Sequence, residues 1–283
     1  MAGMEVRPRD VFVCSYPKSG TTWTQNIVFQ LLTLGEVDLS HISDFCPFFE
    51  ADATWAAGAS PRTVSGALLD GWRVFNTHLR WEQMPRTPSG AGRYLYLVRD
   101  PRDVAVSYWR HLSAMSAADG GFEGDFSAFL SRCCANGVPY GSWAAHVSSW
   151  AAAAAADARV LLVHYERLQS DARGELLRIA RHLRLEELYA SRGTSAAAAV
   201  EAALGRCSFA YMRAHLPRFS PRSVAWRDPS FKFVRRGLVG GHVEAFTPAC
   251  HALLDAAVRA HCDGDPPPLV AEKLAARRPA ADE

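Results

Sequence analysis

The thirteen residues Val11–Trp23 combine an apolar strand, a tight turn and the start of a helix, and they constrain the fold more than any other part of the chain. The apolar run Val11–Val13 is typical of a buried parallel strand, while Pro17 and Gly20 provide a turn in which backbone N–H groups converge on an anion. Apolar residues recur at helical spacing from Trp23 onward, so the turn lies at the positive end of a helix dipole. The segment therefore predicts a loop that binds phosphate.

Lys18 adds a full positive charge to this loop. In nucleotide-hydrolase P-loops the lysine follows the last glycine, whereas Lys18 precedes Gly20 and no glycine begins the run. This order argues against an ATPase. The alternative is an ordinary strand–turn–helix with a surface lysine, and the rest of the chain must decide between the two interpretations.

The composition excludes several classes of protein. The 283 residues, 49% of them hydrophobic, are enough for one well-buried domain, and a net charge of +2 is too small for wrapping nucleic acid. Seven cysteines without metal-ligand spacing indicate reduced thiols in the cytosol and no metal site. We find no signal segment and no long apolar run, so we expect a cytoplasmic protein without membrane contacts.

Further strands alternate with helices along the chain. Residues 72–78, 93–99 and 159–165 read as strands, and residues 103–109 and 175–184 read as helices. This alternation predicts an α/β fold with a central parallel sheet flanked by helices. We expect a single domain over residues 1–283, with a core at about 10–250 and a C-terminal tail at about 264–283 to which we assign no function.

Four polar residues stand at or just past the ends of these strands, namely Lys18, His78, Arg99 and Tyr165. Ligands of parallel sheets bind outside the carboxyl ends of the strands, so the four side chains are expected to meet in one crevice. Taken alone, each of them is more often a structural residue than a functional one. Their shared placement favours a site.

Three segments resemble the cytosolic sulfotransferases, which move a sulfuryl group from 3′-phosphoadenosine 5′-phosphosulfate (PAPS) to a hydroxyl or an amine. Ser15–Trp23 is similar to the family's 5′-phosphosulfate loop, Tyr96–Tyr108 to its 3′-phosphate segment, and Phe231–Gly240 to its C-terminal phosphate-binding segment. The resemblance spans about residues 10–250. It implies PAPS as donor, its product 3′,5′-bisphosphate (PAP), no required metal, and a single P-loop-like α/β domain.

The resemblance also implies a donor site. Backbone groups, hydroxyls and one ammonium of the loop hold the 5′-phosphosulfate, one tryptophan stacks on adenine, and arginines grip the 3′-phosphate through charge-assisted contacts. The implied donor-binding residues are Lys18, Ser19, Gly20, Thr21, Thr22, Trp23, Arg99, Ser107, Tyr165, Cys207, Ser208, Phe209, Arg235, Arg236 and Gly237. Cys207 replaces the usual threonine.

The implied catalytic residues are His78, Lys18 and Ser107. His78 matches the family's general base, and an imidazole suits that role at neutral pH. Small apolar acceptors such as a phenol, a steroid-like alcohol or another alcohol are expected. We place the following residues at the acceptor: Phe45, Phe48, Phe49, Trp55, Asn76, Trp81 and Tyr140.

Besides Cys207, the chain departs from the family pattern in two places. Asn76 stands where active members usually have lysine, so a second interpretation is a protein that binds PAPS or PAP with weak or no turnover. Gly241 and His242 replace a common Trp-Lys pair, and Pro248 interrupts the family's dimerisation sequence, which leaves monomer and homodimer open. A nucleotide kinase or hydrolase is the third interpretation; the position of Lys18 argues against it.

Overall fold

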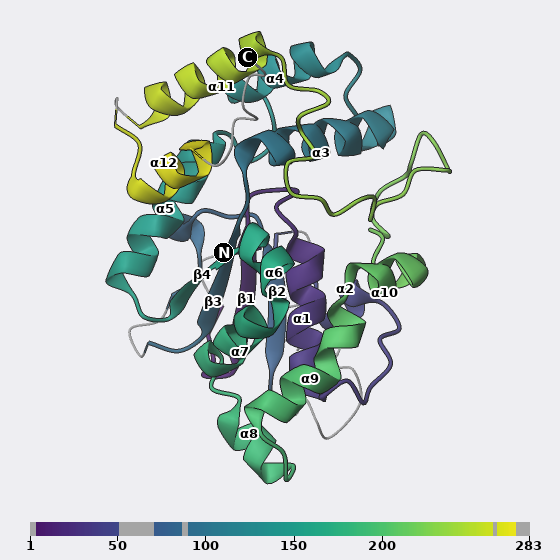
Figure 1. Cartoon of the computed structure of the whole chain (residues 1–283), viewed down its shortest axis with the longest axis vertical. Helices are drawn as coiled ribbons and strands as arrows, with labels where there is room; N and C mark the ends of the chain where they lie inside the picture. The colour runs from purple at the N-terminus through teal and green to yellow at the C-terminus, as the bar shows by residue number, and fades with distance from the viewer. Residues whose placement is uncertain (1–3, 51–70, 87–89, 263–264, 276–283) are drawn as a thin grey trace.

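The computed structural model describes residues 4–50, 71–86, 90–262 and 265–275. Four parallel strands form one sheet in the order β2-β1-β3-β4 (Figure 1). The strands are β1 (Asp10–Ser15), β2 (Arg73–Thr77), β3 (Arg93–Val98) and β4 (Val160–His164). All three of the strands expected after the first one are confirmed, as is the parallel sheet.

Helices fill most of the chain between and after the strands. The α-helices are α1 (Thr21–Thr33), α2 (Ile42–Phe45), α3 (Pro101–Ala114), α4 (Phe126–Cys134), α5 (Trp143–Ala156), α6 (Tyr165–Ser170), α7 (Ala172–His182), α8 (Glu186–Ser191), α9 (Ala196–Cys207), α10 (Phe209–Ala214), α11 (Pro248–His261) and α12 (Pro268–Ala275). Short 3₁₀ helices are η2 (Trp81–Gln83), η3 (Ala117–Asp119) and η4 (Leu216–Arg218).

The sheet is buried on both faces, which explains the continuous apolar run in β1. Val11 and Val13 face a cluster that includes α1, α7 and α9, whereas Phe12 and Cys14 face a cluster that includes α3, α4, α5 and α11. Side chains of a strand alternate between faces, so the middle of β1 is apolar at every position, while Asp10 and Ser15 at its two ends are buried with hydrogen-bond partners. The result is three layers with the sheet in the middle (Figure 1).

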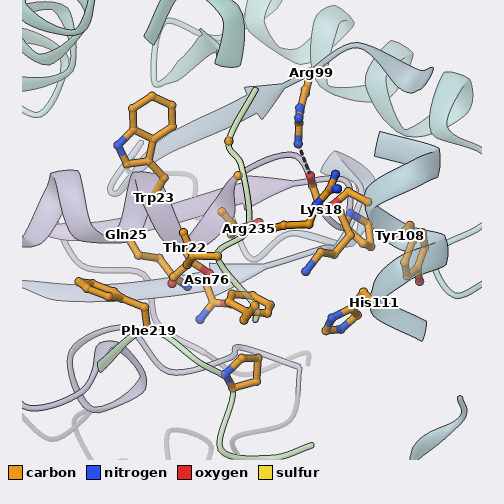
Figure 2. Close-up of a pocket in the computed structure, with 18 of the residues that line it drawn as sticks. Lys18, Thr22, Trp23, Gln25, Asn76, Arg99, Tyr108, His111, Phe219 and Arg235 are labelled. Atoms are coloured by element: carbon orange, nitrogen blue, oxygen red, sulfur yellow. Dashed lines mark hydrogen bonds between the residues drawn. The ribbon is translucent and has the colours of Figure 1, made fainter. Parts of the chain in front are cut away.

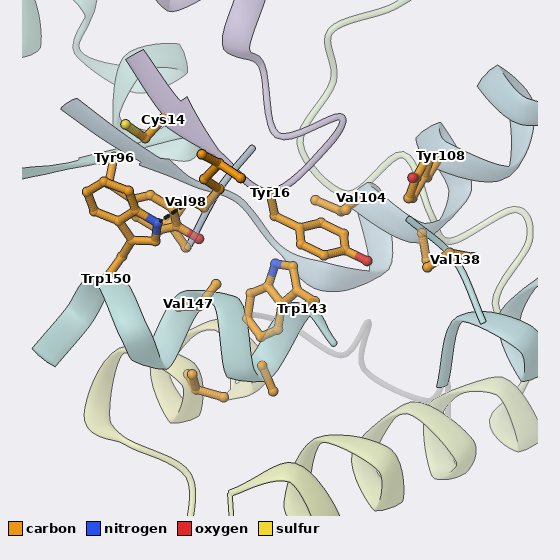
Figure 3. Close-up of a cluster of buried hydrophobic side chains, with 14 of the residues drawn as sticks. Cys14, Tyr16, Tyr96, Val98, Val104, Tyr108, Val138, Trp143, Val147 and Trp150 are labelled. Atoms are coloured by element: carbon orange, nitrogen blue, oxygen red, sulfur yellow. Dashed lines mark hydrogen bonds between the residues drawn. The ribbon is translucent and has the colours of Figure 1, made fainter. Parts of the chain in front are cut away.

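Aromatic rings fill the layer between the sheet and α5 (Figure 3). The Tyr96 ring stacks on Trp150 with ring centroids 5.0 Å apart, and the Trp150 indole nitrogen donates a hydrogen bond to the Leu79 carbonyl. Tyr16, directly after β1, donates from its hydroxyl to the Gly141 carbonyl. These contacts fix the ends of β1 and β2, from which the loops of the site emerge.

The packed core continues past residue 250. Val270 of α12 is fully buried, and α12 packs on α5 within the segment read from sequence as a tail. Lys273 of α12 forms an ion pair with Glu166, whose other oxygen accepts the backbone N–H of Asp100. α12 is thus tied to the start of α3. Pro248 begins α11 with Thr247 as its cap, so the proline that breaks the family's dimerisation sequence starts a helix here.

Candidate active site

A cavity of about 630 Å³ lies at the carboxyl ends of the strands (Figure 2). β1 lies between β2 and β3, so the strand order reverses direction at β1. The crevice at such a point is the usual ligand position in parallel sheets. Most residues predicted for the site line this cavity: Lys18, Gly20, Thr21, Thr22, Trp23, Phe48, Asn76, His78, Arg99, Ser107, Tyr140, Tyr165, Phe209, Arg235, Arg236 and Gly237.

The other predicted residues lie outside the lining. Phe45 and Phe49 are buried in the two core clusters, and Trp81 packs against the edge of Tyr94. Cys207 offers its backbone carbonyl to the Trp23 indole nitrogen at 2.7 Å. Two serines also lie outside the lining: Ser19 is a fully buried residue of the loop, and Ser208 caps α10 with its hydroxyl. Trp55 lies outside the described residues.

The loop after β1 has the shape of an anion site. Lys18 (φ 67°) and Gly20 (φ 108°) both adopt left-handed backbone angles, and a Cβ on Gly20 would approach the Tyr165 ring to 2.9 Å. Gly20 caps α1 without any side-chain hydrogen bond. The first N–H groups of the helix therefore remain available to an anion. Within the described residues, the buried Ser19 hydroxyl also has no partner.

The Lys18 ammonium lies over the Phe233 ring, 4.0 Å from its centroid. Burial lowers the pKa of Lys18 to about 7, and the positive charge of Arg99 acts in the same direction. An anion bound at the loop restores the charged form, because an opposite charge favours it. Lys18 is therefore poised to take up a proton together with an anionic ligand.

Arg99 connects the two segments that the sequence predicts to bind phosphate. Its guanidinium donates to the Lys18 carbonyl at 3.4 Å and to the Leu238 carbonyl at 2.9 Å, and it lies 4.2 Å from the centroid of the Tyr165 ring (Figure 2). The Tyr165 hydroxyl donates to the Gly237 carbonyl at 2.9 Å. Gly237 (φ 63°) packs so tightly that a Cβ would meet the Phe209 ring at 2.5 Å. The loop carrying Arg235 and Arg236 is thus docked on the sheet.

Asp103 of α3, which the sequence did not single out, fastens the far end of this segment. Its carboxylate accepts the backbone N–H groups of Gly240 and His242 and the His242 Nδ1–H, each at 2.9 Å. Burial alone would raise the pKa of Asp103, but the His242 hydrogen bond and the Arg99 charge outweigh it and lower the pKa. Asp103 stays ionised and holds the segment.

Positive charge accumulates in the cavity that Ser107 also lines. Arg235 lines the cavity, and its pKa is lowered by burial and by the neighbouring charges of Arg110, Arg236 and Arg99. Arg236 pairs with the exposed Glu244 at 2.9 Å. Arg99 also pairs with Asp103, whereas Arg110 and Arg235 have no salt bridge within the described residues, so the cluster favours a bound anion such as a phosphate.

His78 has the tautomer of a general base. Its Nδ1 lies 2.8 Å from the Ser15 carbonyl, an acceptor only, so Nδ1 carries the proton and Nε2 keeps its lone pair. The imidazole lies between the rings of Phe48 and Tyr140, with centroids at 5.6 and 5.3 Å. Burial lowers the pKa of His78 to about 4, and the Lys18 charge contributes. The ring is therefore neutral at physiological pH.

Two further residues hold His78 in place. The Glu50 carboxylate accepts the His78 backbone N–H at 2.7 Å, and His146 donates from Nε2 to the His78 carbonyl at 2.8 Å. The Tyr96 hydroxyl lies 2.9 Å from the other nitrogen of His146. Glu50 was not identified from the sequence, although a carboxylate that directly follows an apolar stretch was a visible signal.

The Asn76 amide is already engaged. It donates to the Cys46 carbonyl at 2.7 Å, and the Asn76 backbone pairs with the segment Pro47–Phe49. Asn76 still lines the cavity, two residues before His78. One donor of its amide is therefore committed to the protein rather than to a ligand.

Two negative findings concern the described residues alone. Within these residues, His, Cys, Asp and Glu side chains form no group of three or more that could hold a metal ion. No helix in the same part of the chain has the length and apolar character needed to span a membrane.

Sequence comparisons agree with this geometry. A family model described as the sulfotransferase domain matches residues 8–269. Sulfotransferase 1C2 of Oryctolagus cuniculus is 30% identical over 277 residues, which cover 92% of this chain and 85% of the relative. Sulfotransferase 1E1 of Homo sapiens is 31% identical over 187 residues, which cover 63% of this chain and 60% of the relative.

Solved structures show the same fold. Mouse sulfotransferase SULT7A1 complexed with PAP is 24% identical with a TM-score of 0.69, covering 93% of this chain and 87% of that one. Retinol dehydratase in complex with androsterone and inactive cofactor PAP is 21% identical with a TM-score of 0.67, covering 92% and 82%. Because the family match extends over almost the whole chain, this protein belongs to the sulfotransferase family.

Proposed function

We propose that the protein transfers the sulfuryl group of PAPS to a hydroxyl, or an amine, of a small and largely apolar acceptor. The observation that carries the proposal is the position of the His78 imidazole, with a free Nε2 lone pair, in the same cavity as the Lys18 loop and the arginine cluster. The start of α1, which no side chain caps, and the Gly20 cradle fit the 5′-phosphosulfate. The arginine cluster fits the 3′-phosphate.

The residues divide the chemical work. PAPS supplies an activated sulfuryl group and leaves as PAP. His78 Nε2 accepts the proton of the acceptor hydroxyl as the oxygen forms its bond to sulfur. Charged Lys18 stabilises the negative charge that the departing phosphate oxygen gains when its bond to sulfur breaks. Most of the catalysis is positioning and electrostatics, as in phosphoryl transfer.

The acceptor side of the cavity supports an aromatic or alicyclic alcohol. Phe48, Tyr108, Tyr140 and Phe219 line the cavity together with His78. Apolar lining with a few placed polar groups is the usual character of a small-molecule site. We also retain the predictions of a cytoplasmic protein and of a monomer or homodimer.

A second candidate function is a PAP-binding protein with weak turnover. The engaged amide of Asn76 favours it, because no ammonium is present there to contact the sulfuryl group. PAP binding without any sulfated product across a panel of phenols and alcohols would support this alternative.

The donor site predicts selective stabilisation by PAP. A ligand at a hundred times its dissociation constant adds about 2.7 kcal/mol to the native state. At roughly 2–4 °C per kcal/mol, the melting temperature should rise by about 5 °C or more with PAP. ADP, which lacks the 3′-phosphate, should give a smaller shift, and Arg235→Gln should reduce the difference. Equal shifts with the two nucleotides would remove the 3′-phosphate assignment.

The pKa of Lys18 predicts a pH profile. Since kcat/KM for PAPS reports the free enzyme, it should fall above pH 7 as Lys18 loses its proton, and below about pH 4 as His78 gains one. At saturating PAPS the alkaline limb of kcat should move to higher pH, because bound phosphate raises the pKa of Lys18. Lys18→Arg should abolish the alkaline fall. A wild-type kcat/KM that rises between pH 7 and 9 would contradict this assignment.

A further inference from the structure

His111 lies on the cavity wall formed by α3. Tyr108, His111 and Leu112 line the cavity from one face of that helix, and Met115, which caps its C-terminus, lines it as well. Tyr108 directs its hydroxyl to the Pro139 carbonyl, 3.4 Å away. Figure 2 shows His111 beside Tyr108, on the opposite side of the cavity from Trp23 and Gln25. His111 is therefore a polar side chain in a largely apolar wall, and the mechanism above makes no use of it.

The imidazole of His111 sits among aromatic rings. Its ring centroid is 5.3 Å from that of Trp226 and 5.8 Å from that of Phe233. Its Nδ1 is buried, and the described residues provide it with no hydrogen bond. Burial lowers the pKa of His111, so the ring is neutral and carries one N–H and one lone pair.

The unpaired Nδ1 decides which nitrogen carries the proton. A buried N–H without an acceptor is rarer than a buried lone pair without a donor, because the N–H loses a strong hydrogen bond to water. We therefore assign the lone pair to Nδ1 and the proton to Nε2. The Nε2–H is then the group that His111 can offer to a molecule in the cavity.

His111 is close to the reacting groups but not part of them. The Phe233 ring that contacts His111 also lies under the Lys18 ammonium. His78 approaches the cavity from another element, at the end of β2. An acceptor whose hydroxyl meets His78 therefore has a different part of its surface against α3.

We propose that His111 is a specificity-determining residue that donates a hydrogen bond to a second, uncharged oxygen of the acceptor. The preferred acceptors are then phenols or alcohols that carry another hydroxyl or a carbonyl. An ammonium is disfavoured by the nearby Lys18 charge, and a carboxylate by the aromatic rings around His111. The inference rests on the proposed sulfuryl transfer and names the acceptor class for it.

The test compares phenols of matched shape. 4-Hydroxybenzyl alcohol and 4-ethylphenol differ by one hydroxyl in place of a methyl group, and the 3-substituted pair covers the other geometry. With PAPS as donor, wild type should favour the hydroxymethyl phenol of at least one pair by about five- to tenfold in kcat/KM. His111→Phe, which keeps an aromatic ring, should bring that ratio to one or below. Met115→Leu, which changes an apolar lining residue just past the end of α3, should keep the wild-type ratio.

A second variant separates recognition from folding. His111→Gln places an amide N–H near the position of Nε2 and should restore part of the preference, and PAP should raise the melting temperature of every variant as it does for wild type. An unchanged ratio in His111→Phe would overturn the inference, as would equal rates for both members of both pairs in wild type. Absence of sulfated product from all four phenols would overturn the proposed function itself. An unexpected ratio with product formed would overturn only the inference about His111.

Discussion

Replacing His78 by asparagine is expected to lower kcat by about 10²- to 10⁴-fold, the usual contribution of a positioned general base. The amide nitrogen of asparagine can occupy the place of Nδ1 and keep the hydrogen bond to the Ser15 carbonyl, which measures 2.8 Å in the native protein. Only the lone pair of Nε2 is then lost. The acceptor hydroxyl would have to lose its proton to water, with the rest of the cavity intact.

Single-turnover formation of a sulfated phenol measures this effect without interference from product release. The PAP-induced rise in melting temperature should be the same in His78→Asn and wild type. His215→Asn is a matched control, because His215 also points its Nδ1 at a backbone carbonyl, that of Tyr211, but does not line the cavity in the described chain. A loss of less than tenfold in His78→Asn would exclude His78 as the base.

Replacing Asn76 by lysine is expected to raise kcat by roughly ten- to a hundredfold. A charge-assisted hydrogen bond contributes about 1.5–3 kcal/mol, and each 1.4 kcal/mol is about tenfold in rate. The native Asn76 amide already donates one of its N–H groups to the Cys46 carbonyl, 2.7 Å away, so that N–H cannot supply this contact. A lysine at this position extends an ammonium into the cavity, beside the group being transferred.

The variant also loses the hydrogen bond to Cys46, at a typical cost of about 1 kcal/mol. Asn76→Met is the matched control, since it loses the same hydrogen bond and has a long side chain without charge. It should show no gain in turnover, and its melting temperature should fall by about as much as that of Asn76→Lys. Equal or lower turnover in Asn76→Lys than in wild type, with PAP binding retained, would show that the missing ammonium does not limit the rate.

The local signals in the sequence were sufficient for the sheet and for the phosphate loop. The middle residues of a strand buried on both faces are mostly apolar without interruption, so β1 and β3 are visible without any knowledge of their neighbours. The turn at Gly20 is equally local. Because the carboxyl ends of parallel strands lie at one edge of the sheet, the sequence also predicts that Lys18, His78 and Arg99 lie together at that edge. All three line one cavity.

The acceptor wall was harder to predict, because an aromatic residue suits a core and a pocket equally well. Phe48 and Phe49 are neighbours, yet Phe48 lines the cavity while Phe49 packs against Phe12 and Phe75. The segment pairs with β2 at Asn76 as an extended strand does, so successive side chains point to opposite sides. The function of Asp103 was hidden for a different reason, since its partners are 137 and 139 residues away in sequence.

The Asp103 carboxylate also sets how this part of the chain can vary in length. Gly237 is held by Tyr165 at one end of the segment, and Gly240 and His242 are held by Asp103 at the other. Between these two anchors, Leu238 and Val239 expose about half of their surface, at 53% and 50%. Substitutions at these two positions should be tolerated, whereas insertion or deletion of one residue would break one anchor and move the arginines out of register with Ser107. The spacing from Gly237 to His242, more than the identity of the residues within it, is therefore the feature that related chains with this carboxylate must preserve.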